Sequence, residues 1–445
     1  MGNSTMNKSV VNNIVFWLLI LISFIGYYFM TYELIRSNFY HLIGGYAGLF
    51  MIYWLIQKYW DENISVIIGL GISFRLLVIF AFPNLSDDVF RFIWDGRLIN
   101  AGENPFLHLP SWYMDGKPAI SGLSNDLFTQ LNSPNYYTIY PPILQTVFAI
   151  SSFLFPKDIY AAALIMKFFI LLAECGTIVF LLKLFKQFEI HAKNIAIYAL
   201  NPLVIIELCG NLHFEAFMIF FLLLSVWWLV KNRIILSGFA MAFAVCAKLL
   251  PLMFLPFLIR RLGLKNSALY FATIGATTAL LFIPFLSQEL FTNLYQSIDL
   301  YFQKFEFNAS IYYVVRSIGF QIKGWNIIAT AGPIMSGITA LTIFIIAARE
   351  RVTSHKSLLQ KMSFALLLYF SMATIIHPWY VCTLVALTAF WKWRFPLVWS
   401  FLIPLSYFAY SNPDYQENLW LVAIEYTAIP LFAFFEWRQG WHEEY

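Results

Sequence analysis

Long runs of apolar residues without a charge recur along the whole chain, and they constrain its fold more than any other feature. A helix needs about 20 apolar residues to cross the hydrocarbon core of a bilayer. Of the 445 residues, 60% are apolar and 12% are charged, whereas a soluble domain carries about 25% charged residues. The sequence therefore excludes the soluble-enzyme and disordered-chain classes and predicts a membrane protein. The net charge of +4 is too weak and too dispersed to indicate a nucleic-acid partner.

We expect an all-α polytopic membrane protein with roughly fourteen transmembrane helices, two of them short, in a single domain over residues 1–445. The first run lacks a small-residue cleavage site and is followed at once by further runs, so we expect it to remain as an anchor. The candidate spans lie near residues 14–31, 41–58, 64–82, 159–184, 194–209, 214–230, 234–247, 249–259, 267–286, 325–348, 361–376, 379–393, 396–411 and 418–436.

The basic residues indicate how these spans are oriented. Cytoplasmic loops carry an excess of Lys and Arg, and most of the 28 such residues fall inside when the N-terminus is cytoplasmic. Both termini are then cytoplasmic. The apolar run 140–155 would reverse this pattern if it crossed the membrane, so we interpret it as an interfacial helix. Residues 83–158 then form one large extracytoplasmic loop, and the run 233–260, basic at both ends, places Lys248 at an outer turn.

Acidic residues gather on the outer side of this topology, and the densest group follows the third span in the segment SDDVFRFIWDGR, residues 86–97. On a helix, Asp88, Arg91 and Trp94 follow one another at intervals of three and share a face with Asp87. One interpretation is a capping residue at the start of a solvated amphipathic helix. The other is a pair of carboxylates that act as a general base and as a metal or phosphate ligand. Spacing alone leaves both open.

A set of motifs in a fixed order resembles a known superfamily. The segments are SDDVFRFIWDGRLINAGENPF, YPPILQTVFA, NPLVIIELCGNLHFEAFMIFFLLL, AVCAKLLPLMFLPFL, FEFNASIYYVVRSIG and HPWY. From about Leu85 to Tyr380 the chain resembles bacterial integral-membrane glycosyltransferases of the GT-C superfamily, and most nearly the polyprenol-phosphate-mannose-dependent mannosyltransferases. The resemblance implies the GT-C fold, in which a large first outer loop carries the catalytic carboxylate and interface helices.

The resemblance also implies a reaction. The donor would be a polyprenyl-phosphate sugar, with mannose as the expected hexose, and the acceptor would be a lipid or a glycan at the extracytoplasmic face of the cell membrane. One Asp of the acidic pair would act as general base on the acceptor hydroxyl, with Asp87 favoured by position and Asp88 as the second choice. Attack from the face opposite the lipid phosphate would invert the anomeric carbon.

The second outer loop carries Asn211, His213 and Glu215, at the place where the resemblance implies further polar residues near the active site. Together with Asp88, Glu215 is a candidate ligand of a divalent metal, magnesium or manganese, and no organic cofactor is expected. The resemblance leads us to expect Asp as often as Glu at this position. Alternatively, these side chains only satisfy the backbone of a short loop.

Several cations are candidates for binding the donor phosphate. Lys248 at its outer turn could stabilise the negative charge of the leaving group, or extend to the lipid headgroups. Arg91 and Arg97 have the planar guanidinium that matches phosphate oxygens, or they contact loop carboxylates. His377 of the HPWY motif could contact the donor phosphate or the acceptor, or simply pack.

Trp94, Asp95 and Tyr140 complete the expected substrate-binding set. The rings of Trp94 and Tyr140 could stack on sugar faces, although Trp and Tyr are also common in the interfacial belts of membrane proteins. Lys167 and Glu174, seven residues apart in one predicted span, are expected to form a structural ion pair.

Two other functions compete with glycosyl transfer. A transporter or flippase of lipid-linked sugars would have repeats and broken helices at the membrane midplane, and the hairpin around Lys248 is a weak sign of this kind. A transporter would not have its polar residues clustered at one membrane face. In this sequence the expected polar residues do cluster in that way. A GT-C ligase that moves a different group at the same face is the second alternative.

Overall fold

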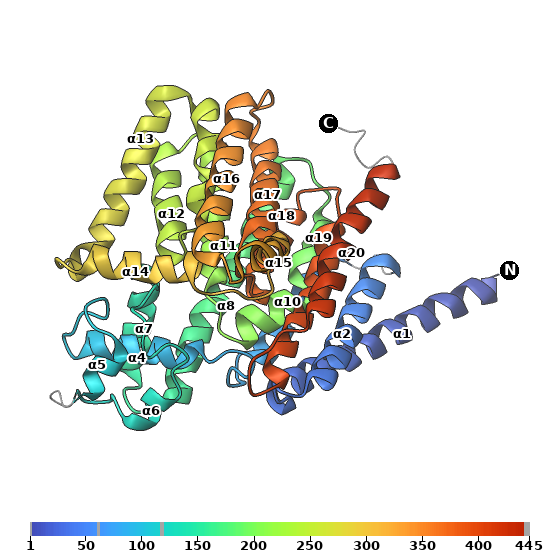
Figure 1. Ribbon diagram of the computed structural model, residues 1–445. Coiled ribbons are helices and arrows are strands. Elements are labelled where there is room, and N and C mark those ends of the chain that lie inside the picture. Colours follow the sequence, from blue (N-terminus) through green and yellow to red (C-terminus); the bar gives the residue numbers. More distant parts are fainter. Residues whose placement is uncertain (1, 60–62, 116–119, 440–445) are drawn as a thin grey trace.

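The computed structural model describes residues 2–59, 63–115 and 120–439. Regular structure in this part of the chain is helical, apart from one isolated parallel bridge between Phe307 and Ile375. The expectation of an all-α fold is therefore confirmed. Figure 1 shows a bundle of long helices with a group of short helices covering one of its ends.

Among the described residues, six helical segments are long and apolar enough to cross a membrane. They are α1 with η1 (Asn13–Glu33), α2 (Phe39–Tyr59), α8 (Ile159–Gln187), α13 with η5 (Pro256–Phe285), α16 (Ile328–Arg349) and α20 (Leu419–Arg438). A seventh is formed if the segments Ala192–Ala199 (η2 and α9) and Pro202–Gly210 (α10 and η3), bent by 51°, count as one span. The chain is thus a membrane protein, while the expected number of fourteen helices stays a prediction.

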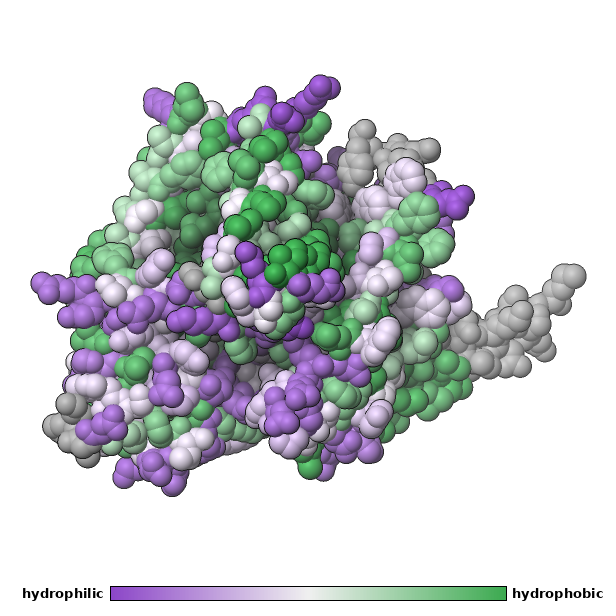
Figure 2. All heavy atoms as spheres, in the orientation of Figure 1, coloured by the Kyte–Doolittle hydropathy of each residue, from purple (hydrophilic) through white to green (hydrophobic). Residues whose placement is uncertain are grey.

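Shorter apolar helices accompany these spans. They are α3 (Ile64–Val78), α7 (Pro142–Leu154), α11 (Glu215–Val230), α12 (Ile234–Ala247), η6 with α18 (Pro378–Thr388) and α19 with η7 (Phe395–Ser411). The helix α17 (His355–Met372) runs between α16 and α18 in the chain. Figure 2 shows apolar residues in a belt between two more hydrophilic levels, as expected for a molecule surrounded by lipid.

The expected runs 249–259 and 267–286 lie on either side of a kink in the chain, within the basic segment 260–266. The short helix η4 (Leu250–Phe254) leads into α13 (Pro256–Phe282), and Gly263 interrupts α13 with φ 72° and ψ 164°. Glycine adopts a positive φ without the steric cost that other residues meet. The chain therefore changes direction at this residue, among the basic residues Arg260, Arg261 and Lys265 that separate the two apolar stretches.

The region 83–158 holds the short helices α4 (Asp88–Asn100), α5 (Pro110–Met114), α6 (Asn125–Thr129) and α7. The helices α4 and α7 pack closely, because a Cβ atom on Gly96 would lie 2.3 Å from the carbonyl oxygen of Phe148. Phe92 stacks on Phe148 with the ring centroids 4.6 Å apart. With 13 residues, α7 is about 20 Å long, too short to cross the hydrocarbon core upright.

Two further amphipathic helices, α14 (Leu290–Gln303) and α15 (Ile311–Lys323), lie at the end of the bundle that carries this region (Figure 1). The amide of Asn293 on α14 donates to the carbonyl oxygen of Phe106 at 2.8 Å, and Ser297 donates to that of Tyr137 at 3.0 Å. Large apolar side chains such as Phe291 and Tyr295 face outward. The polar side of α14 therefore fixes the region 83–158 against the bundle.

The expectation of a structural ion pair between Lys167 and Glu174 is wrong. Glu174 instead pairs with Arg75 of α3 at 2.9 Å, while Lys167 donates to the carbonyl oxygens of Val78 and Ala81. The last carbonyl groups of a helix have no partner within it, so the ammonium of Lys167 is used to satisfy the end of α3. Both interactions fix α3 to α8.

Candidate active site

The acidic pair lies where the chain enters α4, and contacts from two other segments hold this entry. The side-chain oxygen of Asn211 accepts hydrogen bonds from the backbone N–H groups of Asn84 at 3.2 Å and Leu85 at 2.9 Å. The guanidinium of Arg36 donates to the carbonyl oxygen of Leu85 at 3.3 Å. Asn211 therefore positions the backbone that precedes Asp87.

Asp87 occupies the N-cap position of α4, but its side chain makes no capping hydrogen bond. Its carboxylate instead pairs with the guanidinium of Arg36 at 2.7 Å. The ring of Tyr410 covers that guanidinium, with its centroid 4.3 Å from Cζ of Arg36. The negative charge of Asp87 is therefore balanced by a neighbouring cation.

Asp88 is the first residue of α4 and is half-buried. Its carboxylate accepts a hydrogen bond from the amide of Asn132 at 2.7 Å. Burial, with the negative charges of Glu215 and Asp87, raises the pKa of Asp88 to about 6, although Asn132 and the positive charge of Lys248 oppose the shift. A carboxyl group that titrates near neutrality is suited to take up and release a proton.

Glu215 and Lys248 form an ion pair beside Asp88. Glu215 begins α11, and Lys248 follows α12 in an extended conformation with φ −159° and ψ 137°. The ammonium also lies 3.7 Å from the ring centroid of Tyr380. The side chain of Glu215 is 6% exposed, whereas that of Lys248 is 30% exposed. The cation is thus held in place from one side and accessible from the other.

Two histidines stack on the ring of Trp379. The ring centroids are 3.8 Å apart for His213 and 4.5 Å apart for His377, and both pairs are nearly parallel. Burial lowers the pKa of each histidine to about 3, and the positive charge of Lys248 acts in the same direction. Both imidazoles are therefore neutral at pH 7. In the described part of the chain, Nε2 of His213 and Nδ1 of His377 have no hydrogen-bond partner.

The structure thus brings together most of the expected site residues at one end of the bundle. The charges of Glu215 and Lys248 influence the pKa of Asp88, and Lys248 and His213 contribute to the lowered pKa of His377. Segments far apart in the sequence supply this group, which consists of Asp87, Asp88, Asn211, His213, Glu215, Lys248 and His377.

Arg91 and Asp95 are also on α4 but bind each other and the chain around them. Nε of Arg91 donates to Asp95 at 2.9 Å, and the guanidinium also donates to the carbonyl oxygens of Ser133 and Tyr136. Asp95 further accepts hydrogen bonds from side chains of the 138–145 segment. Both side chains are buried. Their geometry supports a role in positioning the segment that carries Asn132, rather than the expected contact with substrate.

Trp94, Arg97 and Tyr140 are packed within the region 83–158. Trp94 is fully buried against the rings of Tyr113 and Phe128. Arg97 donates to the carbonyl oxygen of Gly122 at 2.6 Å, and burial lowers its pKa. Tyr140 packs edge-on against aromatic rings of α4 and α7. The structure therefore supports packing roles for these three residues, and their contact with substrate stays a prediction.

Several residues near the acidic pair were missed by the sequence analysis. Arg36 is one of the few basic residues left outside by the expected topology, which was a signal that went unused. Trp379 and Tyr380 belong to the HPWY motif, of which only His377 was considered. Asn132 and Tyr410 carry no local signal at all, because their proximity to the acidic pair arises from the fold alone.

A divalent metal is not favoured by these residues. Over residues 2–59, 63–115 and 120–439, no group of three or more His, Cys, Asp or Glu side chains is arranged to hold a metal ion. Oε1 of Glu215 is already bound by Lys248. The expectation of magnesium or manganese at Asp88 and Glu215 therefore stays a prediction, and no step below depends on it.

Comparison with known proteins gives a family match. A family model described as alpha-(1->6)-mannopyranosyltransferase, N-terminal domain, matches residues 22–262, just over half of the chain. No curated protein matches. The matched range contains Asp87, Asp88, Glu215 and Lys248, and ends before His377.

Proposed function

This chain belongs to the alpha-(1->6)-mannopyranosyltransferase family, and from that membership we propose that it transfers mannose from a polyprenyl-phosphate donor to an acceptor hydroxyl. As a mannosyltransferase it requires a sugar donor and an acceptor, and the acceptor we propose is a glycan or a lipid. The observation that carries the proposal is the placement of half-buried Asp88 beside the Glu215–Lys248 ion pair. A base and a phosphate-binding cation are thereby next to each other.

Asp88 is the better placed general base of the two carboxylates. Asp87, which the sequence favoured, is bound by Arg36, so its lone pairs are less available to a proton. In the proposed step, the carboxylate of Asp88 takes the proton of the acceptor hydroxyl while the acceptor oxygen attacks the anomeric carbon. The bond from this carbon to the phosphate oxygen breaks, and polyprenyl phosphate leaves with the electron pair.

Lys248 supports the departure of the phosphate. A leaving phosphate gains negative charge in the transition state, and a fixed cation stabilises this charge most where water is excluded. The ion pair with Glu215 and the ring of Tyr380 restrict the ammonium to one position. Because the two buried histidines are neutral, the charge complementary to the phosphate comes from Lys248 rather than from an imidazolium.

The stereochemistry of this reaction follows from a single displacement. Such a displacement inverts the anomeric carbon, and the family description specifies an alpha linkage in the product. The donor must then carry mannose in a beta linkage to phosphate. Synthetic donors of both anomers test this, because only the beta donor should be consumed and the product should be an alpha mannoside.

We place the reaction at the extracytoplasmic face of the cell membrane, in a multi-pass protein with cytoplasmic termini. The site, the region 83–158 and α14 share one end of the bundle (Figure 1). Basic residues mark the other end, where Arg260 and Arg261 contact the α16–α17 connection through Ala348 and Glu350. This distribution supports the assignment, since cytoplasmic loops are enriched in Lys and Arg.

The deciding experiment uses the full chain in lipid nanodiscs with polyprenyl-phosphate mannose that carries a radiolabelled sugar. Label should move to a mannoside acceptor with the wild-type protein and with the control Asp126→Asn, which changes an exposed carboxylate on α6. With Asp88→Asn it should move about 10²- to 10⁴-fold more slowly. If the labelled donor instead crosses a liposome membrane and its sugar–phosphate bond stays intact, the flippase alternative replaces this proposal.

A further inference from the structure

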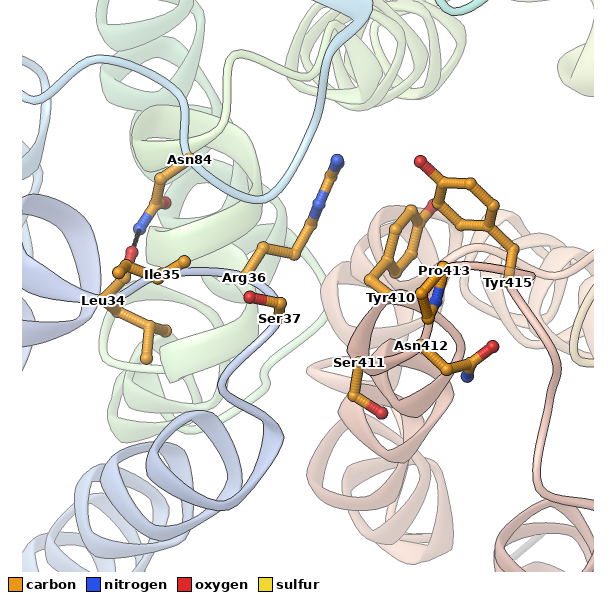
Figure 3. A pocket seen from close by; sticks show the side chains of 10 residues that line it. All are labelled: Leu34, Ile35, Arg36, Ser37, Asn84, Tyr410, Ser411, Asn412, Pro413 and Tyr415. Carbon is orange, nitrogen blue, oxygen red and sulfur yellow. Dashed lines mark hydrogen bonds between the residues drawn. The ribbon is translucent and has the colours of Figure 1, made fainter.

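A cavity of about 580 Å³ lies next to the acidic pair, between the turn after η1 and the loop after η7. Figure 3 shows the side chains around it, with Arg36 on one side and two tyrosine rings facing it from the other. Its size is within the range of roughly 300–1,000 Å³ typical of small-molecule sites. The lining residues are Leu34, Ile35, Arg36, Ser37, Asn84, Tyr410, Ser411, Asn412, Pro413 and Tyr415.

This cavity is connected to the proposed catalytic residue through two of its lining side chains. Arg36 binds Asp87 at 2.7 Å. The ring of Tyr410 covers Arg36, and the phenol is within the electrostatic influence of both Asp88 and Asp87. A ligand in the cavity therefore lies on the side of the acidic pair that Arg36 occupies, whereas Lys248 pairs with Glu215 of α11.

The chemistry of the lining selects against an anion and combines polar groups with apolar surface. Arg36 is the only lining residue with a positive charge, and Asp87 already balances that charge. Leu34, Ile35 and Pro413 are the only lining residues without a polar side chain. The remaining groups are hydroxyls, amides and phenols, which suit a neutral ligand with many hydroxyl groups.

Tyr415 is held at the edge of the cavity in an unusual conformation. Its φ is 52°, a left-handed backbone conformation that residues other than glycine rarely adopt. Its ring is 64% exposed and meets the ring of Tyr410 edge-on, with the centroids 5.8 Å apart. Backbone strain of this kind often occurs at sites that bind ligands. Two aromatic rings at right angles thus present apolar surfaces to the opening.

We propose that this cavity is the acceptor subsite and that it binds the end of a neutral mannose-containing glycan, whose terminal hydroxyl then faces Asp88. The inference rests on the proposed function and identifies its acceptor as a glycan rather than a lipid. Tyr410 and Tyr415 contact the apolar faces of the sugar rings. Polar groups around the cavity, such as the hydroxyl of Ser37, bind sugar hydroxyls.

The test measures acceptor binding without any donor, so that it is independent of the reaction. Equilibrium binding of alpha-1,6-linked mannotriose to the full chain in nanodiscs is compared for the wild type, Tyr415→Ala and Ser37→Trp. Loss of the ring should weaken binding about tenfold, and Trp at exposed position 37 should fill the cavity and abolish binding. Tyr295→Ala on α14, whose ring is 66% exposed, is the matched control and should bind as the wild type does.

The outcomes separate this inference from the proposed function. If the wild type binds mannotriose in the expected way but releases no mannose from the donor, the proposed function fails and the glycan site stands. If the wild type transfers mannose but mannotriose binding is absent, or is unchanged in both cavity variants, the inference is overturned. The inference is also overturned if inorganic phosphate binds in the cavity and mannotriose does not, because this result would show a site for an anion.

Discussion

Two carboxylates on α4 lie in contrasting surroundings, one at its start and one near its middle. At the first turn, Asp88 is half-buried and accepts one hydrogen bond from Asn132, with the charges of Glu215 and Lys248 close by. Seven residues later, Asp95 is fully buried and accepts hydrogen bonds from Arg91, Thr138 and Gln145. The first carboxylate has capacity left for a substrate, and the second has none.

This difference shows that residue type and spacing do not determine the role of an acid on a helix. Asp95 already accepts hydrogen bonds from side chains of the region 83–158, so its interactions stabilise the fold of that region. Asp88 lies near the start of α11 and the residue that follows α12, through the charges of Glu215 and Lys248, and its partners only partly satisfy it. The predictions below test this contrast from its strongest consequence to its weakest.

The largest effect is expected for Asp88→Asn. The amide cannot take a proton from the acceptor hydroxyl, so kcat should fall by about 10²- to 10⁴-fold, the usual contribution of a general base. Thermal stability should be retained, because Asn can still interact with Asn132. Steady-state transfer of labelled mannose measures the first effect and thermal unfolding the second. Asp87→Asn should lose less activity, and a reversed order would return the role of base to Asp87.

Asp95→Asn should have the opposite profile. It leaves the buried guanidinium of Arg91 without its countercharge, and breaking a buried ion pair costs about 3–5 kcal/mol. We therefore expect a lower free energy of unfolding and less folded protein, but near-normal activity per folded molecule at low temperature. A folded and stable Asp95→Asn protein without activity would show that Asp95 takes part in the chemistry.

Lys248→Gln should reduce kcat about 10²-fold, comparable with the loss of one group that stabilises negative charge in a transition state. The substitution also leaves Glu215 buried without its partner. Lys248→Gln combined with Glu215→Gln removes that second problem and should still be impaired if the cation binds phosphate. Full activity in the double variant would leave Lys248 with only a structural role.

The membrane segments were predictable from the sequence because their signal is local. The expected run 234–247 has the same limits as α12, and the expected runs 41–58 and 159–184 differ from α2 and α8 by only a few residues. Uncharged length is enough to define such a helix. The break at Gly263 was also marked in the sequence, because Arg260, Arg261 and Lys265 separate the two expected runs. The bend of 51° between Ala192–Ala199 and Pro202–Gly210 was not predicted, because no charged residue marks it within the expected run 194–209.

The candidate site was predictable only in part, for a related reason. The motifs contain the acidic pair, Glu215 and Lys248, so a search for charged residues at the expected outer ends of apolar runs finds them. Arg36 and Tyr410 come from opposite ends of the chain, and only the fold reveals that they meet beside Asp87. Arg91 and Asp95 were expected on a common helix face, but spacing cannot tell whether that face meets substrate or protein.

The smallest predicted effect is a dependence on pH that belongs to Asp88 alone. Burial raises the pKa of Asp88 to about 6, and a general base works only when it is deprotonated, so kcat/KM should fall about tenfold per unit as the pH drops below 6. The residual activity of Asp88→Asn should not show this fall. Asp88→Glu keeps a titrating carboxyl group and should keep an acid limb in its profile. An acid limb that persists in Asp88→Asn would assign the titration to another group and remove this support for Asp88 as the base.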